Sequence, residues 1–456
     1  MVNVVTVLGA AGHIIPVTVN GSQAYSLAQA YQAAVNGASA SGNLFAAEGN
    51  GVGVPAPTGG SMVNEYVASS GGFYTFPSGY DHFVTDTGSK VFIDASGASA
   101  GTTLSTLVGT GGATFISGNE SGTFVAGGGN NLFIGSGAGT YQVATSDGND
   151  SIFAGTGNTY IYGGTGDNLI TLGAGADTVQ SDGTDRIIAG TGNDTIALSG
   201  TASTIYGGSG TSLVDDSAGT STSIAGGTGA SSITGGTDGF YTLNGPSTVF
   251  AGLSDTITAS AASTIYGTSG TTFTGIGSGS ALTFIGGPGS ATVNSGIGTA
   301  TVFGADGSNI TYTGAGTLVA GSGNETLNGS GSTQGFAGFI SNQVVAGNDS
   351  IGGGTGADTL VAGLGNQTLS GGSGAANQFI IAANGTMSQA TITISDFGSA
   401  AGNMVYLYGY GANEVQNALS TAVTAGGSTT ITLADKSTVT FAGVTSLNSS
   451  SFKADA

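Results

Sequence analysis

The chain of 456 residues has no cysteine and no tryptophan, and it contains only four lysines and arginines and two histidines. The absence of cysteine excludes disulfides and thiolate metal sites. The scarcity of cationic side chains argues against nucleic acid and anionic membrane surfaces as partners, because both are bound through positive charge. No apolar run reaches the length of a membrane span, so we expect no membrane insertion.

Glycine and acidic residues dominate what is present, with 89 glycines and a formal net charge of -21. A glycine-rich composition also occurs in disordered segments. Here, however, 39% of the residues are hydrophobic, and they recur with a regular period. The sequence therefore indicates an ordered repeat protein.

The clearest repeat runs from Asp150 to Ala197, where a glycine turn and a short apolar strand recur about every nine residues. Its glycine turns are Gly155-Thr156-Gly157, Gly164-Thr165-Gly166, Gly173-Ala174-Gly175 and Gly190-Thr191-Gly192. Such a repeat is typical of a parallel β-solenoid, in which two repeats form one coil and each coil pairs with its neighbours. We expect the glycines to supply positive φ angles and close backbone approach at these turns.

The alternation of side chains along each strand predicts a ladder of apolar residues that points inward. The members expected on one side are Ile152, Ile170 and Ile187 or Ile188, and those expected on the other side are Ile161, Val179 and Ile196. The predicted fold class is all-β, a right-handed parallel β-solenoid with terminal capping modules.

The repeats resemble the RTX nonapeptide G-G-x-G-x-D-x-U-x, in which U is a large aliphatic residue. Residues 353–361 match it at every fixed position, and residues 163–171 match it with Asn168 in place of aspartate. The resemblance implies that sixth-position aspartates and turn carbonyls chelate Ca²⁺ between coils, with oxygen ligands that suit a hard cation. It also implies type I export, and hence a protein secreted to the exterior or cell surface of a Gram-negative bacterium.

The predicted calcium ligands are sixth-position carboxylate and amide residues, namely Asp150, Asn168, Asp177, Asp185, Asp194, Asp349 and Asp358. A calcium ion between coils needs oxygen ligands about 18 residues apart, so Asp177 with Asp194 is the best pair and Asp150 with Asn168 the next. Many other sixth positions hold threonine, serine, glutamine or alanine, and we therefore expect few ions. The alternative is that these residues only form Asx hydrogen bonds within turns.

The composition divides the chain into three predicted regions. Residues 1–115 form an N-terminal capping or assembly region, with a short helix over 26–35 that stops at Asn36-Gly37 and caps the open end of the solenoid. Residues 116–378 form the glycine-rich solenoid. Residues 379–456 form a C-terminal β module, with strands expected at 379–381, 391–394, 404–408, 429–433 and 438–441 and a helix at 414–419. Its segments 394–398, 405–410 and 433–444 resemble the C-terminal module of type I secreted RTX proteins.

We expect no catalysis. The basic residues Lys90, Arg186, Lys436 and Lys453 are scattered along the chain. The neighbouring Asp215 and Asp216 should face opposite sides of a strand, so they cannot share a substrate. His82 lies beside Asp81 but has no second histidine at ligand spacing, and we expect it to be a surface residue.

The sequence favours a structural protein that binds itself as a polymeric homo-oligomer, through head-to-tail contacts between its terminal regions. The assembly would be an extracellular fibre, a biofilm matrix or a surface layer. The alternatives are a monomeric calcium-dependent adhesin, with cell-surface polysaccharide as its partner, and a polysaccharide-binding or ice-binding module. Ice binding needs a T-x-T motif in every coil, as in 391–393 and 438–440, and the sequence does not repeat it in that way.

Overall fold

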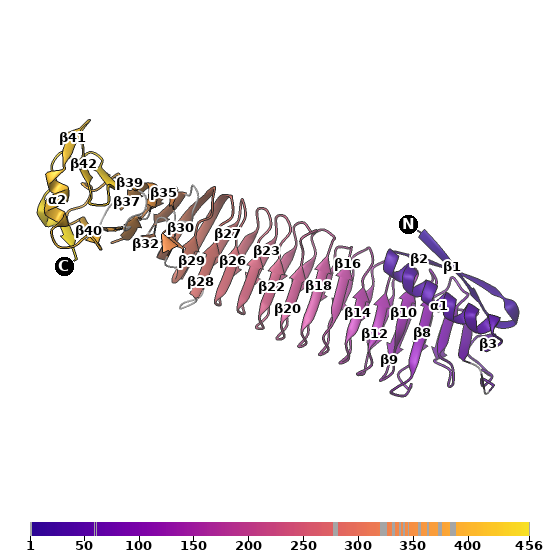
Figure 1. Ribbon diagram of the computed structural model, residues 1–456. Helices are drawn as coiled ribbons and strands as arrows, with labels where there is room; N and C mark the ends of the chain where they lie inside the picture. Colours follow the sequence, from indigo (N-terminus) through magenta and orange to yellow (C-terminus); the bar gives the residue numbers. More distant parts are fainter. Residues whose placement is uncertain are drawn as a thin grey trace. The chain divides into compact units, whose positions relative to one another are not determined.

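The computed structural model describes residues 2–58, 60, 62–276, 281–319, 326–330, 333–336, 339–340, 343–344, 346–353, 357–362, 364–372, 376–383 and 389–455. The chain is almost entirely β and divides into two compact units, Met1–Gly236 and Thr237–Ala456, each a stretch of parallel β-solenoid (Figure 1). Among the described residues, no helix has both the length and the apolar character needed to cross a bilayer.

The first unit stacks its coils as two parallel sheets. The first sheet comprises β3 (Leu44–Gly49), β4 (Val63–Ala68), β6 (His82–Thr85), β8 (Thr103–Val108), β10 (Ser121–Ala126), β12 (Tyr141–Ala144), β14 (Thr159–Tyr162), β16 (Thr178–Ser181), β18 (Asp194–Leu198), β20 (Ser212–Asp215) and β22 (Ser231–Thr234). The second comprises β5 (Gly72–Thr75), β7 (Val91–Asp94), β9 (Ala113–Ser117), β11 (Leu132–Gly135), β13 (Ser151–Phe153), β15 (Leu169–Thr171), β17 (Arg186–Ile188), β19 (Thr204–Tyr206) and β21 (Ser223–Ala225). The parallel ladder thus begins at β3, inside the region that the sequence assigned to the cap.

The core between the two sheets is the predicted apolar ladder. In the second sheet Ile152, Ile170 and Ile187 follow one another in register, and in the first sheet Ile161, Val179 and Ile196 do the same. All six side chains are buried, whereas Ile188 points away from the core. The inward ladder is confirmed, with Ile187 as its member. Full burial of one such side chain contributes about 1.5–3 kcal/mol.

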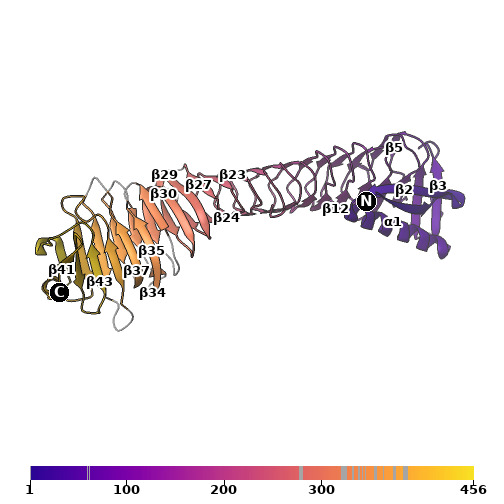
Figure 2. The same ribbon diagram turned by 90° about the horizontal axis from the view of Figure 1, so that it is seen from above.

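The N-terminal segment packs on the outer face of the first sheet. The antiparallel strands β1 (Val2–Leu8) and β2 (Ile14–Asn20) are joined by the 3-10 turn η1 (Ala10–Gly12), and helix α1 (Ser22–Ala40) follows. They form one apolar cluster with an outward column of the first sheet, made of Val67, Val84, Leu107, Val125 and Ala144. Figure 1 shows α1 lying across the strands around β8 and β10, and Figure 2 shows it beside β2. The expectation that the helix caps the open end of the solenoid is therefore wrong, because it covers a lateral face.

Helix α1 is longer than the sequence predicted. It begins after Gly21, where φ is 85°, and buries Tyr31 and Val35 against the sheet. It runs through Gly37 and ends before Gly42, where φ is 72°. A glycine inside a helix costs only about 1 kcal/mol relative to alanine, and the packing of Ala38 on the same apolar face offsets that cost.

The second unit also stacks two parallel sheets. The third sheet contains β23 (Phe240–Leu243), β25 (Thr256–Ala259), β27 (Thr272–Gly275), β31 (Thr326–Ser330), β35 (Ala346–Gly352), β37 (Leu364–Ser370), β39 (Thr391–Ile394) and β43 (Thr438–Phe441). The fourth contains β24 (Ser247–Phe250), β26 (Ser263–Tyr266), β28 (Ala281–Ile285), β32 (Thr333–Phe336), β36 (Thr359–Ala362), β38 (Gln378–Ala382), β40 (Met404–Tyr408) and β44 (Phe452–Ala454). The long strands β29 (Gly289–Phe303) and β30 (Ser308–Val319) take part in both, with a register shift between Asn294 and Thr299.

The elements predicted for the C-terminal region are confirmed. The expected strands are β38, β39, β40, β43 and β42 (Ser428–Thr432), and the expected helix is α2 (Glu414–Ser420). Four of these strands, β38, β39, β40 and β43, continue the parallel ladders. Strand β42 pairs antiparallel with β43 and with β41 (Val423–Ala425). A short antiparallel pair, β33 (Phe339–Ile340) with β34 (Gln343–Val344), and the 3-10 turn η2 (Ser449–Ser451) complete the described elements.

Candidate metal-binding turns

The glycine turns of the first unit stack so closely that a side chain cannot fit. A Cβ on Gly173, Gly190 or Gly192 would overlap a backbone carbonyl oxygen of the previous coil. Of the four predicted turns, only the one with Gly164 and Gly166 has positive φ angles, 69° and 115°. The expectation that glycine supplies positive φ at every turn is therefore wrong at the other three. Close approach between coils is what requires glycine there, and it lines each turn with carbonyl oxygens.

Asn131, Asp150, Asn168 and Asp185 occupy equivalent places in four consecutive coils, just before β11, β13, β15 and β17. We call this set the first ladder. Each side chain from Asp150 onward accepts a hydrogen bond from the backbone N–H of the preceding member, and all four residues are buried. The distances are 2.7 Å from Asn131 N to Asp150 Oδ1, 2.9 Å from Asp150 N to Asn168 Oδ1, and 2.8 Å from Asn168 N to Asp185 Oδ1.

Thr159, Asp177 and Asp194 form a second ladder, along the starts of β14, β16 and β18. Asp177 Oδ1 accepts from Thr159 N at 2.7 Å, and Asp194 Oδ1 accepts from Asp177 N at 3.2 Å. The second oxygen of Asp177 accepts from Gly173 N, also at 3.2 Å. The structure thus brings together both pairs that the sequence selected, Asp177 with Asp194 and Asp150 with Asn168, in consecutive coils.

One carboxylate oxygen of three ladder aspartates has no hydrogen-bond partner among the described residues. These atoms are Oδ2 of Asp150, Asp185 and Asp194, and all are buried. The two asparagines of the first ladder carry a donor at the equivalent atom. Asn131 Nδ2 donates to the carbonyl of Gly129, and Asn168 Nδ2 donates to the carbonyl of Gly163, both at 3.0 Å. An ionised carboxylate oxygen has no hydrogen to donate to a carbonyl, so these oxygens need either a proton or a cation.

Burial raises the pKa of Asp185 to about 6, although hydrogen bonds from Asn168 act in the opposite direction. The pKa values of Asp150, Asp177 and Asp194 are also raised, chiefly by the same loss of solvation. A buried carboxylate without a partner is costly. A proton or a cation relieves that cost, and the donor set of carboxylate and carbonyl oxygens is the one that Ca²⁺ prefers. The residues of the two ladders therefore fit calcium.

The two predicted ligands in the second unit lie in separate surroundings. Asp358 N donates to Asn377 Oδ1 at 2.8 Å, and Asn377 N donates to Asn403 Oδ1 at 2.7 Å. Asp349 Oδ2 accepts from Gln367 Nε2 at 3.4 Å. Both aspartates are buried. Residues 354–356 of the consensus repeat lie outside the described residues.

The sequence analysis missed Asp255, which is fully buried at the start of β25. Its two oxygens accept from Gly239 N at 2.8 Å and from Gly252 N at 2.6 Å. The signal was present, because Asp255-Thr256-Ile257 repeats the phrase Asp194-Thr195-Ile196. Backbone N–H groups thus reach both carboxylate oxygens of Asp255, as they also do at Asp177.

Two other sequence expectations concern acidic pairs and histidine. Asp215 is exposed and Asp216 is buried, so the two do face opposite sides of the strand, as predicted. His82 is not a surface residue, because only 14% of its side chain is exposed. Its ring packs edge-on against Tyr31 of α1 at 5.0 Å, and its Nδ1 lies 2.6 Å from Asp81 Oδ1.

Comparison with family models finds the RTX calcium-binding nonapeptide repeat at residues 145–179, 180–214 and 345–375. The chain therefore contains RTX-type repeats within its parallel β-solenoid. The matched segments contain all seven predicted ligand residues, and both ladders lie largely within the first two. Neither the curated proteins nor the solved structures with which the chain was compared give a match. RTX repeats are calcium-binding motifs of typically secreted proteins, and this chain fits that type.

Proposed function

We propose that this RTX-type protein is a secreted, non-catalytic structural protein that assembles with copies of itself outside the cell, in a fibre, biofilm matrix or surface layer. Its ladder turns hold a few calcium ions, with Asp177 and Asp194 as one pair and Asp150, Asn168 and Asp185 as the other set. When bound, calcium supplies the positive charge that the partnerless oxygens require. The residues themselves hold the coils in register through the Oδ1 hydrogen bonds.

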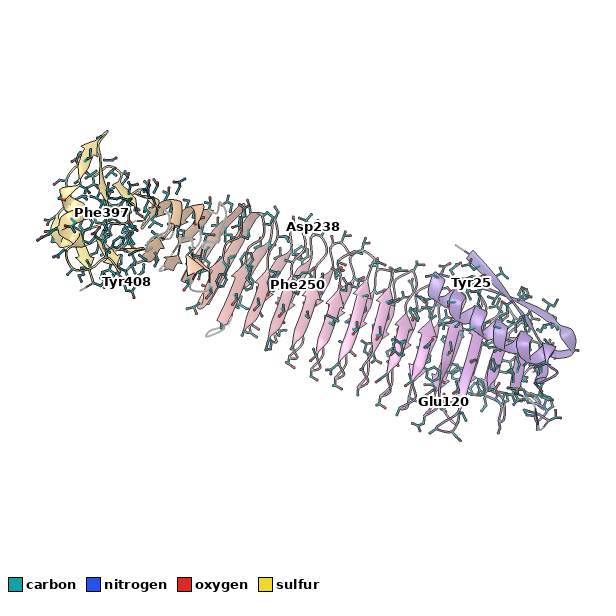
Figure 3. The ribbon with its side chains drawn as sticks, in the orientation of Figure 1. Tyr25, Glu120, Asp238, Phe250, Phe397 and Tyr408 are labelled. Atoms are coloured by element: carbon teal, nitrogen blue, oxygen red, sulfur yellow. The ribbon has the colours of Figure 1, made fainter. Side chains whose placement is uncertain are left out.

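The main support for self-assembly is the uncharged outer face of the fourth sheet. Five threonines follow one another at one register position, namely Thr248, Thr264, Thr283, Thr301 and Thr317. Five apolar residues lie two places further along the same strands, namely Phe250, Tyr266, Ile285, Phe303 and Val319. The rings of Phe250 and Tyr266 stack at 4.7 Å, and both are exposed. Phe250 is labelled in Figure 3.

Contact between a face of this kind and another copy costs little desolvation free energy. None of its ten outward residues is charged, so no ion must be desolvated on contact. Exposed aromatic residues in a row are typical of interaction surfaces. Strand β3, which has its ladder partner β4 on one side, supports the head-to-tail contact, because a strand edge is a template for a further strand.

Electron microscopy of the purified protein with calcium, and then with a chelator, tests the proposal. We expect ordered filaments or sheets with calcium, and assemblies that dissolve on chelation if calcium links the copies. Phe250→Lys should prevent assembly. Phe240→Lys is the matched control, since Phe240 is equally a phenylalanine of the second unit, is exposed, and lies on the third sheet. Single particles under both conditions would contradict the proposed assembly and favour a monomeric calcium-dependent adhesin.

A second candidate, ice binding, is favoured by the register of the third sheet. Four consecutive coils place T-x-T or T-x-N at one position, namely 256–258, 272–274, 292–294 and 311–313. The motif thus recurs locally over these four coils, although it does not repeat in every coil of the solenoid. Strands are about 4.8 Å apart and alternate residues about 6.6 Å apart, which makes a regular grid of hydroxyl and methyl groups.

Thermal hysteresis of a freezing solution measures this second candidate directly. Replacing Thr272 by tyrosine puts a bulky ring into the grid and should abolish the hysteresis. Thr264→Tyr is the control, because Thr264 lies at an equivalent outward position of the fourth sheet. Absence of hysteresis in the unaltered protein removes ice binding and leaves the structural function.

A further inference from the structure

Three side chains of metal-ligating types meet at the surface of the N-terminal segment, and none of them belongs to the two ladders. His13 follows η1 between β1 and β2, Glu48 lies in β3, and Asp86 directly follows β6. His13 Nδ1 is 3.3 Å from Glu48 Oε2, and His13 Nε2 is 3.4 Å from Asp86 Oδ2. One ligand atom from each residue can be chosen so that all three lie within 4.8 Å of one another.

The charges at this cluster are unbalanced. Two carboxylates flank a single imidazole, and neither forms an ion pair with a lysine or arginine among the described residues. The chain has only two histidines, and the other, His82, is engaged with Asp81 and Tyr31. A divalent cation bound to a neutral imidazole would neutralise both carboxylates at once.

We propose that His13, Glu48 and Asp86 bind a divalent transition-metal ion of the zinc class. An imidazole nitrogen is a ligand for zinc, nickel, copper and iron, whereas calcium takes oxygen ligands. Zinc bonds of about 2.0–2.2 Å require the three side chains to close around the ion. Their exposed fractions of 45%, 31% and 31% leave room for that rotation and for water to complete the coordination.

The ion would tie three segments that are distant in sequence. His13 belongs to the β1–β2 pair, whose inner face joins the apolar cluster under α1. Glu48 and Asp86 belong to the first coils of the solenoid. The metal therefore fixes the N-terminal segment to the coil that it covers, and it does so independently of the calcium ladders.

Titration calorimetry of the full chain with Zn²⁺, in saturating Ca²⁺, tests the site. We expect one zinc ion per chain that calcium does not displace. His13→Ala and Asp86→Asn should each weaken zinc binding by at least about tenfold. His82→Ala is the matched control, because it removes the only other imidazole and should leave the zinc affinity unchanged.

Two results would overturn the proposal. One is the absence of zinc binding in the presence of calcium, which would leave the cluster as an imidazole held between two carboxylates. The other is zinc binding that His13→Ala does not change, which would mean adventitious binding to the acidic surface. As a second readout, Co²⁺ should give a visible absorption band with the unaltered protein and with His82→Ala but not with His13→Ala. Circular dichroism of each variant checks that the fold is kept.

Discussion

At the scale of single residues, the choice between aspartate and asparagine decides what a ladder position can do. Both side chains offer Oδ1 to the backbone N–H of the preceding coil, as Asp150 and Asn168 show. They differ at the second atom. The asparagine nitrogen donates to a turn carbonyl, whereas the aspartate oxygen at Asp150, Asp185 and Asp194 is left without a partner. The amide stabilises the coil stack directly, whereas we propose that the ionised carboxylate needs a cation to do so.

Asp185→Asn should separate these two roles. The new amide keeps the bond from Asn168 N and removes the buried charge, so the metal-free protein should gain on the order of 1–3 kcal/mol at pH 7. The same change should lower the number of calcium ions bound. Thermal unfolding with calcium and with a chelator measures both effects. Asp215→Asn, at an exposed aspartate whose pKa is lowered by Ser217, should alter neither. An unchanged calcium response in Asp185→Asn would contradict the assignment of this residue.

Glycine at the turns is required by coil stacking, and substitution there should be costly. An alanine Cβ at Gly190 would meet the backbone carbonyl of Gly173, which cannot move without shifting a whole coil. We expect Gly190→Ala to destabilise the protein by about 1–3 kcal/mol or more. Gly37→Ala is the control, because nothing lies within 4 Å of its Cβ and it occupies a helix interior. There alanine should stabilise by about 1 kcal/mol. Chemical denaturation compares the two, and equal effects would rule out this reason for the glycine repeat.

At the scale of elements, helix α1 depends on a buried acid beneath it. Glu65 of β4 is fully buried, and its Oε1 accepts from the Tyr31 hydroxyl of α1 at 3.0 Å. Burial raises the pKa of Glu65 to about 8, although the bond from Tyr31 lowers it. The folded state therefore keeps a proton that the unfolded chain releases above its ordinary pKa of 4.5.

This difference predicts a pH dependence of the packing of α1. Stability is greatest below pH 4.5, falls as the pH rises toward 8, and is constant above that, with a total loss on the order of 4 kcal/mol. Hydrogen exchange of residues 22–40, corrected for intrinsic rates, should be faster at pH 9 than at pH 6. Glu65→Gln keeps a neutral side chain at all pH values and should flatten this dependence. A slope that survives in Glu65→Gln would assign it to another group.

At the scale of the whole molecule, the net charge of -21 and the buried aspartates lead us to expect that calcium stabilises the folded chain. A ligand that binds only the folded state adds about 2.7 kcal/mol at a concentration 100 times its dissociation constant. Chelation should therefore accelerate hydrogen exchange most in residues 145–214 and 345–375, where the RTX repeats lie. The coils from β3 to β10 should change little, since aromatic packing such as Tyr66 on Phe83 supports them. A uniform change along the chain would contradict this localisation.

The fold class and the ladder positions of the first unit could be predicted from the amino-acid sequence alone. This was possible because the coils there have a nearly constant length, so Asp150, Asn168 and Asp185 recur 18 and 17 residues apart. A constant period along the sequence predicts both which apolar side chains point inward and which residues of neighbouring coils pair. The same reasoning located the strands of the C-terminal region, where alternation of apolar residues is local.

The remaining features became apparent only in three dimensions. In the third sheet Thr256 stacks on Thr272 and Thr272 on Thr292, at separations of 16 and 20 residues, so no fixed period could reveal the threonine grid. The placement of α1 on a lateral face, and the meeting of His13, Glu48 and Asp86, join segments that share no repeat. Which oxygen of each buried aspartate lacks a partner depends on atoms of the neighbouring coil. These features follow from the path of the chain between turns of unequal length, which local sequence patterns do not encode.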